Sequence, residues 1–323
     1  MGGVEWNELS AKANGGTELA ARELEARLPG DLLDEFQIVL SRFVSADPTK
    51  IRILWCHDLP TDPASAHLAN GGWRRFHRIV FVSRWQAQAY IEQYRIPRSR
   101  CQVIPNAVAP IRVDANRRAR RPNGTVRLVY TSTPQRGLNI LLAVFDNICR
   151  ERDDVRLDVF SSFSLYGWPD GDRPFRDLFD ALDRNPRATY HGAVPHARLR
   201  DALVDADVFA YPSIWQETSC RCLIEAMSAG LACVHPDYAA LPETAADRTL
   251  MYPWQQDLGA HASVFHRALL QAIDGLRARD GRLLARLASQ KEFADAHYGW
   301  DVRAAQWEQF LRGIVTLPRR LEI

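Results

Sequence analysis

The chain has 323 residues, of which 46% are hydrophobic and 25% charged, and its formal net charge at pH 7 is +2. This length allows two hydrophobic cores, since domains usually hold about 100–200 residues. The balanced charge gives no overall field that would attract nucleic acid, and no apolar run reaches the ~20 residues of a membrane span. The first residues show no apolar signal-peptide core. We therefore expect a cytoplasmic protein that binds no nucleic acid, with peripheral contact at the inner membrane face left open.

Short apolar runs alternate with helical patterns along the chain. Runs that are apolar on both faces suit strands of a parallel sheet covered by helices, and the alternation predicts an α/β, doubly wound architecture. We expect strands at 36–43, 51–57, 78–83, 101–108, 126–132, 155–162, 188–194, 207–213 and 231–236. We expect helices at 17–28, 84–94, 137–150, 174–184, 196–205, 219–229, 258–275 and 298–314.

The pattern breaks at 109–125, where Pro, Gly, Asn and Arg dominate, and this composition predicts a linker. We therefore expect two Rossmann-like domains that face each other across a cleft. The N-terminal domain spans 1–110 and is completed by the C-terminal helical segment 298–323. The second domain spans 111–297.

The six cysteines are irregularly spaced, and several sit in apolar runs. This pattern is typical of reduced thiols in a cytoplasmic protein. Cys220 and Cys222 are separated by one residue rather than the usual two of a zinc site, and no second Cys/His pair completes one. We expect no bound metal.

Two glutamates, Glu217 and Glu225, bracket the sequence ETSCRCLIE after the apolar run at 207–213. Ligands of open α/β sheets lie beyond the carboxyl ends of strands, which is where Glu217 falls. Thr218 or Ser219 is suited to cap the helix that follows.

Gly230 is suited to end that helix. Unpaired N–H groups and the helix dipole at its start suit a diphosphate. Glu225, about 9 Å further along at ~1.5 Å per residue, could accept hydrogen bonds from a ribose diol. The segment therefore predicts a site for a sugar nucleotide.

The segment AYPSIWQETSCRCLIEAMSAG resembles the Glu-x7-Glu signature of retaining GT-B glycosyltransferases, also described as glycosyltransferase family 4 or glycosyl transferases group 1. Further stretches are similar to that family in the same order along the chain: NGGTE (14–18), VIPNAV (103–108), TSTPQRGL (131–138), HGAV (191–194) and ALPE (240–243). The resemblance covers nearly the whole chain and implies the GT-B fold, with 1–110 as the acceptor domain and 111–297 as the nucleotide-sugar donor domain.

The resemblance also implies roles for individual residues. Arg136 would neutralise the donor diphosphate, Glu217 would hold hydroxyls of the transferred sugar, and Glu225 would hold the ribose. Gly192 and Val194 would line the base pocket.

Other parts of the donor site would come from the backbone and from the N-terminal domain. Gly15 and Gly16 would let the backbone approach the phosphates. His57 would contact the donor sugar or the departing phosphate, although an ordinary loop histidine is the alternative. The backbone of Thr218, Ser219 and Cys220 would contact the donor.

The sequence departs from the family pattern at several positions. Thr131 stands where a second basic residue is usual, so another cation such as Arg84 would have to help. Residues 218–220 read Thr-Ser-Cys in place of Gly-Phe-Gly. The strand expected before the glycine loop is missing or reduced to GGVEW.

We therefore expect a hexosyltransferase that moves a sugar from a UDP- or GDP-linked donor to an acceptor hydroxyl with retention of configuration. The departing diphosphate would take the acceptor proton, and no cofactor or metal is expected. Asp205 and Asp207, a spacing that could suggest manganese, are interpreted as capping and solvated residues. The acceptor could be a glycan, a lipid-linked sugar or a small molecule. A non-catalytic nucleotide-sugar binding protein and a sugar-nucleotide epimerase remain as alternatives.

Overall fold

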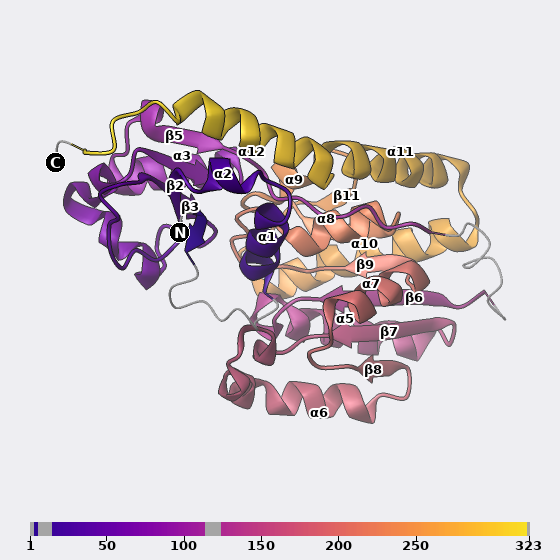
Figure 1. Ribbon diagram of the computed structural model, residues 1–323. Helices are drawn as coiled ribbons and strands as arrows, with labels where there is room; N and C mark the ends of the chain where they lie inside the picture. The colour runs from indigo at the N-terminus through magenta and orange to yellow at the C-terminus, as the bar shows by residue number, and fades with distance from the viewer. Residues whose placement is uncertain (1–2, 6–14, 114–123, 322–323) are drawn as a thin grey trace. The chain divides into compact units, whose positions relative to one another are not determined.

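The computed structural model describes residues 3–5, 15–113 and 124–321, and it divides the chain into two compact units (Figure 1). Unit 1 comprises Met1–Ala107 and Tyr298–Ile323, and unit 2 comprises Val108–His297. The sequence placed this boundary between residues 110 and 111. Most of the expected linker, residues 114–123, lies outside the described residues.

Unit 1 is built on a five-stranded parallel sheet whose strands follow one another in chain order, β1-β2-β3-β4-β5. All four predicted strands of this unit are confirmed, and each ends earlier than predicted. The additional strand, β1, lies in the GGVEW segment and pairs with β2. The strands are β1 (Gly3–Glu5), β2 (Phe36–Leu40), β3 (Ile51–Cys56), β4 (Arg78–Phe81) and β5 (Cys101–Val103).

Successive residues of a strand point to opposite faces of the sheet. In this sheet the residues of each face belong to a separate hydrophobic core, so both faces are covered. Ile38 and Ile53 belong to a core shared with α1 (Gly16–Glu25), α2 (Gly30–Leu33) and α12 (Trp300–Ile314). Val39 and Leu54 belong to a second core, shared with the 3-10 segment η1 (Pro63–Arg75) and with α3 (Arg84–Tyr94). A short 3-10 turn, η2 (Arg98–Arg100), leads into β5.

The C-terminal helix α12, drawn in yellow in Figure 1, belongs to the first of these cores. Trp307 is fully buried, and its ring centroid lies 4.8 Å from that of Trp55 on β3. A helix near residue 300 therefore completes a unit that begins before residue 25.

Unit 2 contains a six-stranded parallel sheet in the order β11-β10-β9-β6-β7-β8. The chain winds outward from β6 in two directions, which is the doubly wound Rossmann order, and the order reverses between β6 and β9. The sequence did not predict β11, which has only three residues. The strands are β6 (Val126–Thr131), β7 (Val155–Phe160), β8 (Ala188–Tyr190), β9 (Val208–Ala210), β10 (Ala232–Pro236) and β11 (Leu250–Tyr252).

The helices of unit 2 include all those predicted between 137 and 275, together with two more, α9 and α11. Helix α11 escaped prediction because it buries few residues, among them the polar Gln290. The helices are α5 (Leu138–Glu151), α6 (Arg176–Arg184), α7 (His196–Asp205), α8 (Arg221–Ser228), α9 (Leu241–Ala245), α10 (Leu258–Arg277) and α11 (Gly281–His297). Three 3-10 turns are η4 (Pro134–Arg136), η5 (Phe163–Tyr166) and η6 (Pro169–Phe175).

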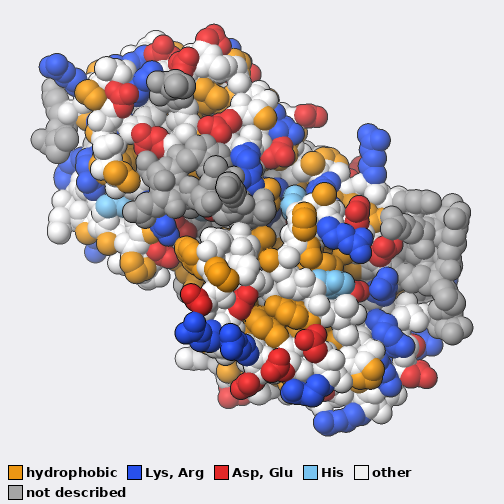
Figure 2. Space-filling model, turned by 60° about the horizontal axis from the view of Figure 1, so that its bottom comes forward, with side chains coloured by type: hydrophobic (Ala, Val, Ile, Leu, Met, Phe, Trp, Pro, Cys, Tyr) orange, Lys and Arg blue, Asp and Glu red, His pale blue; other side chains and the backbone are white. Residues whose placement is uncertain are grey.

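Basic and acidic side chains are interspersed over the face shown in Figure 2, as the small net charge leads one to expect. Among the helices that the structure describes, none is both long enough and apolar enough to cross a lipid bilayer.

Candidate functional site

The switch point of unit 2 brings together two loops that are far apart in the sequence. Turn η4, which ends at Arg136, follows β6, and the loop that carries Glu217 follows the neighbouring strand β9. The next residue, Gly137, has a φ of 111°, and a Cβ atom there would lie 2.1 Å from the carbonyl oxygen of Pro212. Only a glycine allows so close an approach of the two loops without displacing backbone.

The partly buried Arg136 and the buried Glu217 form an ion pair at this point. Nη1 of Arg136 lies 2.8 Å from Oε1 and 2.9 Å from Oε2 of Glu217, and Tyr211 donates a further hydrogen bond to Oε1. Glu217 is 4% exposed. Burial acts to lower the pKa of Arg136, but the Glu217 carboxylate and the neighbouring Tyr166, Tyr211 and Cys222 side chains together outweigh it, and the pKa is raised well above its ordinary value. The guanidinium is therefore a fixed positive charge beyond the carboxyl ends of the strands.

The surroundings of this pair are aromatic. The Arg136 guanidinium carbon lies 5.7 Å from the ring centroid of Trp215, which is 39% exposed. Burial, reinforced by the charge of Glu217, raises the pKa of Tyr211 well above its ordinary value, so its hydroxyl stays protonated and donates. Such a site offers a cation for an anionic ligand and a carboxylate for ligand hydroxyls.

The start of α8 differs from prediction. The sequence placed the N-cap at Thr218 or Ser219, but the helix begins at Arg221 and its N-cap is Cys220, with no side-chain capping bond. Cys220 is in the left-handed region at φ 46°, and this turn separates the two hydroxyl side chains from the first helical turn. The carbonyl oxygen of Ser219 instead accepts a hydrogen bond of 2.9 Å from Thr244 Oγ1.

The predicted end of α8 at Gly230 is confirmed. Gly230 has a φ of 68°, its N–H donates to the Met227 carbonyl, and the N–H of Leu231 donates to the Ala226 carbonyl. This pair of bonds is the Schellman arrangement that favours glycine.

Two thiols lie at the start of α8. The sulfur atoms of Cys220 and Cys222 are 3.5 Å apart, and all six cysteines of the chain are free. Burial raises the pKa of the Cys220 thiol well above its ordinary value. Within the described part of the chain, no three His, Cys, Asp or Glu side chains are grouped so that they could hold a metal ion.

Glu225 is buried at 3% exposure and is bound by a residue that the sequence did not single out. His196 Nε2, at the start of α7, lies 2.7 Å from Oε1 of Glu225, and Nε of Arg221 lies 3.6 Å from the same oxygen. Burial acts to raise the pKa of Glu225, but the hydrogen bond from His196 and the charges of Arg221 and Arg200 lower it. The expected ribose anchor is therefore an ionised carboxylate.

The loop after β8 contains the residues expected beside the base. Gly192, with a φ of 61°, and Val194 are both half-buried there. The preceding residue, His191, stacks on Phe160 with ring centroids 4.2 Å apart, and its Nε2 lies 2.9 Å from Asp158 Oδ1. His191 belongs to the HGAV loop that was expected beside the base, but its stack on Phe160 was not predicted.

The remaining predicted residues lie in unit 1. Gly15 is the N-cap of α1 and Gly16 is its first residue, so a helix does begin at the glycine loop. His57 follows β3; its backbone N–H donates to Ser41 Oγ over 3.1 Å, and its ring centroid lies 4.6 Å from that of Trp55. Arg84 is the first residue of α3. The structure thus brings Arg136 and Glu217 together in unit 2, whereas roles for Gly15, Gly16, His57 and Arg84 in a shared site stay predictions.

Asp205 and Asp207 lie just before β9, at the edge of the sheet opposite to Arg136 and Glu217. Asp207 accepts a hydrogen bond of 2.8 Å from the backbone N–H of Arg127 through Oδ2, and Asp205 ends α7. Thr131, which replaces the second basic residue, ends β6; it is buried, and its hydroxyl is without a hydrogen-bond partner among the described residues.

Residues 125–284 match the family model described as "Glycosyl transferases group 1". This stretch is a glycosyl transferases group 1 domain. It begins directly before β6 and includes Arg136, Glu217 and Glu225.

Two curated relatives are named as subunits of a phosphatidylinositol N-acetylglucosaminyltransferase. A protein of Saccharomyces cerevisiae, the phosphatidylinositol N-acetylglucosaminyltransferase GPI3 subunit, is 23% identical over 207 residues, covering 59% of this chain and 42% of its own length. A phosphatidylinositol N-acetylglucosaminyltransferase subunit from Arabidopsis thaliana is 31% identical over 123 residues, covering 38% of this chain and 25% of its own length. The chain thus spans less than half the length of these relatives.

Solved structures resemble nearly the whole chain. A glycosyltransferase from Rickettsia africae has a TM-score of 0.69 at 12% identity, covering 95% of this chain and 97% of that one. The Anabaena protein HepE, solved with UDP-glucose, has a TM-score of 0.66 at 14% identity, covering 92% and 82%. At these identities the likeness concerns the fold alone. With two parallel Rossmann-like sheets, it confirms the expected GT-B class.

Proposed function

We propose that this protein is a retaining glycosyltransferase that moves a hexose, or a related N-acetylhexosamine, from a nucleoside diphosphate to an acceptor hydroxyl. The observation that carries the proposal is the Arg136–Glu217 pair at the switch point of a glycosyl transferases group 1 domain. The presence of UDP-glucose with HepE and of UDP with the pneumococcal O-GlcNAc transferase GtfA supports a UDP-linked donor. GDP-linked donors remain in the proposal.

On binding, the donor would replace the hydrogen bonds that Arg136 and Glu217 make with each other. Its diphosphate takes over the guanidinium of Arg136, and its sugar hydroxyls donate to the Glu217 carboxylate. The Tyr211 hydroxyl holds that carboxylate in place during the exchange. Because Glu217 is buried and Arg136 is partly buried, and because each already holds the other in place, little reorganisation is needed when charge develops on the leaving group.

The nucleotide would extend from this pair along α8. The diphosphate lies at the start of the helix, where Cys220 supplies no side-chain cap and the dipole favours negative charge. The ribose hydroxyls donate to Glu225, whose ionised state is maintained by His196. Gly192 and Val194 border the base.

In the transfer step the bond between the anomeric carbon and the diphosphate oxygen breaks. The acceptor oxygen forms the new bond on the same face, and its proton passes to the departing diphosphate. This chain's residues bind and stabilise charge, and no protein carboxylate acts as nucleophile. We propose that the reaction needs no metal and that it takes place in the cytoplasm, with peripheral membrane contact if the acceptor is lipid-linked.

The proposal is tested with UDP-glucose, UDP-N-acetylglucosamine and GDP-mannose as donors. We expect calorimetric binding of the matching nucleoside diphosphate and slow donor hydrolysis without an acceptor. Glu217→Gln, which keeps the shape of the side chain, should lower turnover at least about 100-fold, which corresponds to the loss of about 2.7 kcal/mol of transition-state stabilisation. It should leave nucleotide affinity within a few-fold.

Glu151→Gln on the exposed end of α5 is the matched control and should behave as the wild type. Full turnover in Glu217→Gln would sink the assignment. Binding without hydrolysis or transfer would favour a nucleotide-sugar binding protein, and conversion of the donor sugar itself would reveal an epimerase. Proton NMR of the first-formed product determines whether the anomeric configuration is retained.

A further inference from the structure

Two thiols lie side by side in the short stretch between Glu217 and Glu225. Sγ of Cys220, directly before α8, is 3.5 Å from Sγ of Cys222, in the first turn of that helix, and both cysteines are free. A disulfide needs its sulfur atoms at about 2.05 Å and its Cα atoms about 4.4–6.8 Å apart. Residues two positions apart span at most about 7 Å in an extended chain. The left-handed turn at Cys220 shortens that span, so a small local movement is enough to form the bond.

The backbone at Cys220 has a conformation that favours glycine. Its φ of 46° and ψ of 73° are left-handed, where a side chain has a steric cost that a glycine avoids. Its carbonyl oxygen accepts from the N–H groups of Leu223 and Ile224, at 3.1 and 3.3 Å, which keeps the turn in place. Residues held in this way cluster at functional sites. Here the side chain that is kept in spite of the cost is a thiol in contact with Cys222.

The two thiols differ in exposure, and the difference sets the order in which they react. Cys222 is half-buried, whereas Cys220 is only 5% exposed. Burial, together with the hydrogen bond to Cys222, raises the pKa of the Cys220 thiol well above its ordinary value. A reagent from solution therefore reaches Cys222 first, and Cys220 reacts second.

The thiol pair is electrostatically linked to the candidate site. Burial acts to lower the pKa of Arg136, and Cys222 is among the side chains that, with Glu217, raise it. Burial and then Glu217 raise the pKa of Tyr211, and both thiols add to that rise. A change in the bonding of Cys220 and Cys222 therefore acts on the residues that surround the ion pair.

We propose that Cys220 and Cys222 are a reversible oxidation site, at which a low-molecular-weight disulfide such as oxidised glutathione converts the two thiols into a disulfide. The Cys222 thiolate attacks one sulfur of oxidised glutathione and releases one glutathione thiolate. The Cys220 sulfur then attacks Sγ of Cys222 and releases the second glutathione thiolate. The protein loses two electrons, oxidised glutathione gains them, and the proton of each cysteine ends on a glutathione thiol.

The disulfide should weaken nucleotide binding; this consequence rests on the proposed function, whereas the oxidation itself does not. Closing the bond shortens the distance between the sulfur atoms from 3.5 Å to about 2.05 Å and shifts the backbone of residues 220–222. That segment contains the N–H groups at the start of α8, where the diphosphate is proposed to bind. We expect the oxidised protein to bind UDP or GDP at least about fivefold more weakly, which is the lower end of the usual coupling between two sites.

Tryptic peptides of the full chain test the oxidation. The protein is equilibrated in mixtures of reduced and oxidised glutathione, its free thiols are blocked, and it is denatured and digested. Because Arg221 lies between the two cysteines, trypsin separates them in the reduced protein, whereas the disulfide keeps the two peptides linked. Mass spectrometry should find the linked pair, lighter by two hydrogen atoms than the two reduced peptides together.

Reciprocity gives a second measurement. Saturating UDP or GDP should lower the equilibrium ratio of disulfide to dithiol by the same factor by which oxidation weakens the binding of that nucleotide, since the two effects are one coupling free energy. Calorimetry on the reduced and the oxidised protein supplies the affinities, and the peptide ratio supplies the redox equilibrium.

Three variants separate the roles of the thiols. Cys222→Ser should leave Cys220 unmodified, and oxidised glutathione should not change its nucleotide affinity relative to its own reduced form. Cys220→Ser should stop at a mixed disulfide between Cys222 and glutathione. Cys149→Ser removes a half-buried thiol from α5 and is the matched control, which should oxidise as the wild type does.

Separate peptides at every glutathione ratio, or glutathione on Cys220 in Cys222→Ser, would overturn the proposal. Linked peptides with unchanged nucleotide affinity would keep the oxidation site and refute its effect on binding. Linked peptides in a protein that binds neither UDP nor GDP when reduced would instead refute the proposed donor site.

Discussion

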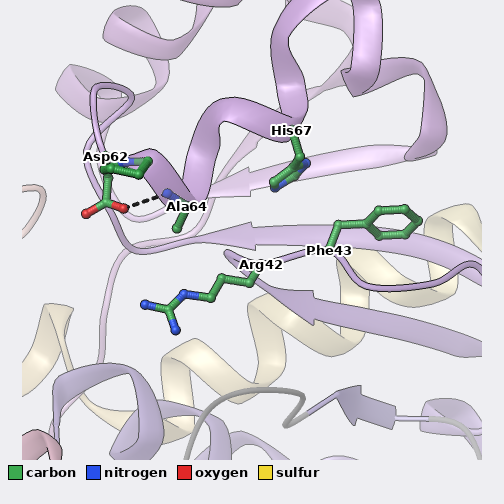
Figure 3. A pocket seen from close by; sticks show the side chains of 6 residues that line it. Arg42, Phe43, Asp62, Ala64 and His67 are labelled. Carbon is green, nitrogen blue, oxygen red and sulfur yellow. Dashed lines mark hydrogen bonds between the residues drawn. The ribbon is translucent and has the colours of Figure 1, made fainter.

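The two parallel sheets collect their polar groups in different ways. In unit 2 the strand order reverses at β6 and β9, and the reversal places Arg136 beside Glu217 across 81 positions of sequence. In unit 1 the strands run in chain order. Arg42 follows β2, Asp62 follows the neighbouring strand β3, and both line an open hollow (Figure 3). The first arrangement gives a closed ion pair, and the second gives charges that line an open surface.

The difference shows that reversal of strand order creates proximity that sequence distance does not suggest. It also shows that the two units rely on different supports. Unit 2 is contiguous in the chain, whereas unit 1 needs α12 to complete a core. Each of the following substitutions or conditions is expected to change the stability of one unit and not of the other.

The largest expected effect is on unit 1. Trp307→Ala removes a fully buried ring that contacts Trp55, and such truncations cost about 4 kcal/mol. We expect the unfolding transition of unit 1 to shift to lower denaturant while that of unit 2 stays in place, measured by calorimetry and by guanidinium titration. A single transition that shifts as a whole would show that the two units do not unfold separately.

The next effect concerns the closed ion pair of unit 2. Arg136→Met leaves the Glu217 carboxylate buried without its cation, which should cost about 3 kcal/mol. Arg312→Met on α12 removes an arginine from an exposed pair with Glu308 and should cost less than about 1 kcal/mol. Equal losses in the two variants, by denaturant unfolding, would contradict the contrast between buried and exposed charge.

Acid should weaken unit 2 through His235. This side chain is fully buried on β10, where its ring nitrogens lie 2.9 Å from the Pro236 carbonyl oxygen and 2.7 Å from Thr249 Oγ1. Burial lowers its pKa from 6.5 to about 4. The unfolded chain therefore binds a proton first, so stability is full above pH 6.5 and falls by about 3 kcal/mol as the pH drops toward 4.

Unfolding measured between pH 7 and pH 4 should show this loss in the wild type and much less of it in His235→Gln. The same slope in both proteins would assign the acid sensitivity to other groups.

The smallest expected effect is a gain. Arg95 is exposed and left-handed at φ 56°, directly after α3 in unit 1. Arg95→Gly removes the steric cost of that conformation and should stabilise unit 1 by about 1 kcal/mol, seen as a rise in its melting temperature. Arg98→Gly, at a nearby exposed position without a left-handed backbone, should give no such rise.

Much of the fold followed from the sequence because runs such as 51–57 and 126–132 are apolar on both faces, which distinguishes parallel strands from amphipathic ones. Elements that depend on partners were not visible. Strand β11 is held by pairing with β10, and α11 buries too few apolar residues to show a helical period. Strand ends were also overestimated, since the apolar pattern runs past the last ladder bond.

The site was only partly predictable. Arg136 and Glu217 were named from the family resemblance, but their direct pairing depends on the close approach at Gly137, which no local pattern reveals. Tyr211 could have been predicted as a site residue, because it directly follows β9 and ligands bind beyond the carboxyl ends of such strands. No sequence pattern marked His196, because a histidine at the start of a helix is common. Its role appears only when α8 packs beside α7 and brings Glu225 within hydrogen-bond distance. The N-cap was misplaced because hydroxyl residues at 218 and 219 suggested a cap that the left-handed Cys220 prevents.

The position of α12 also sets an order of events during synthesis. Unit 2 is complete once residue 297 has left the ribosome, whereas the sheet of unit 1, whose last strand ends at Val103, waits for Trp307. Nearly 200 residues are thus made while one face of that sheet lacks the part of its cover that α12 supplies. The strands of unit 1 are thus translated before unit 2 but reach their final packing after it, and that interval is when their apolar face is open to chaperones.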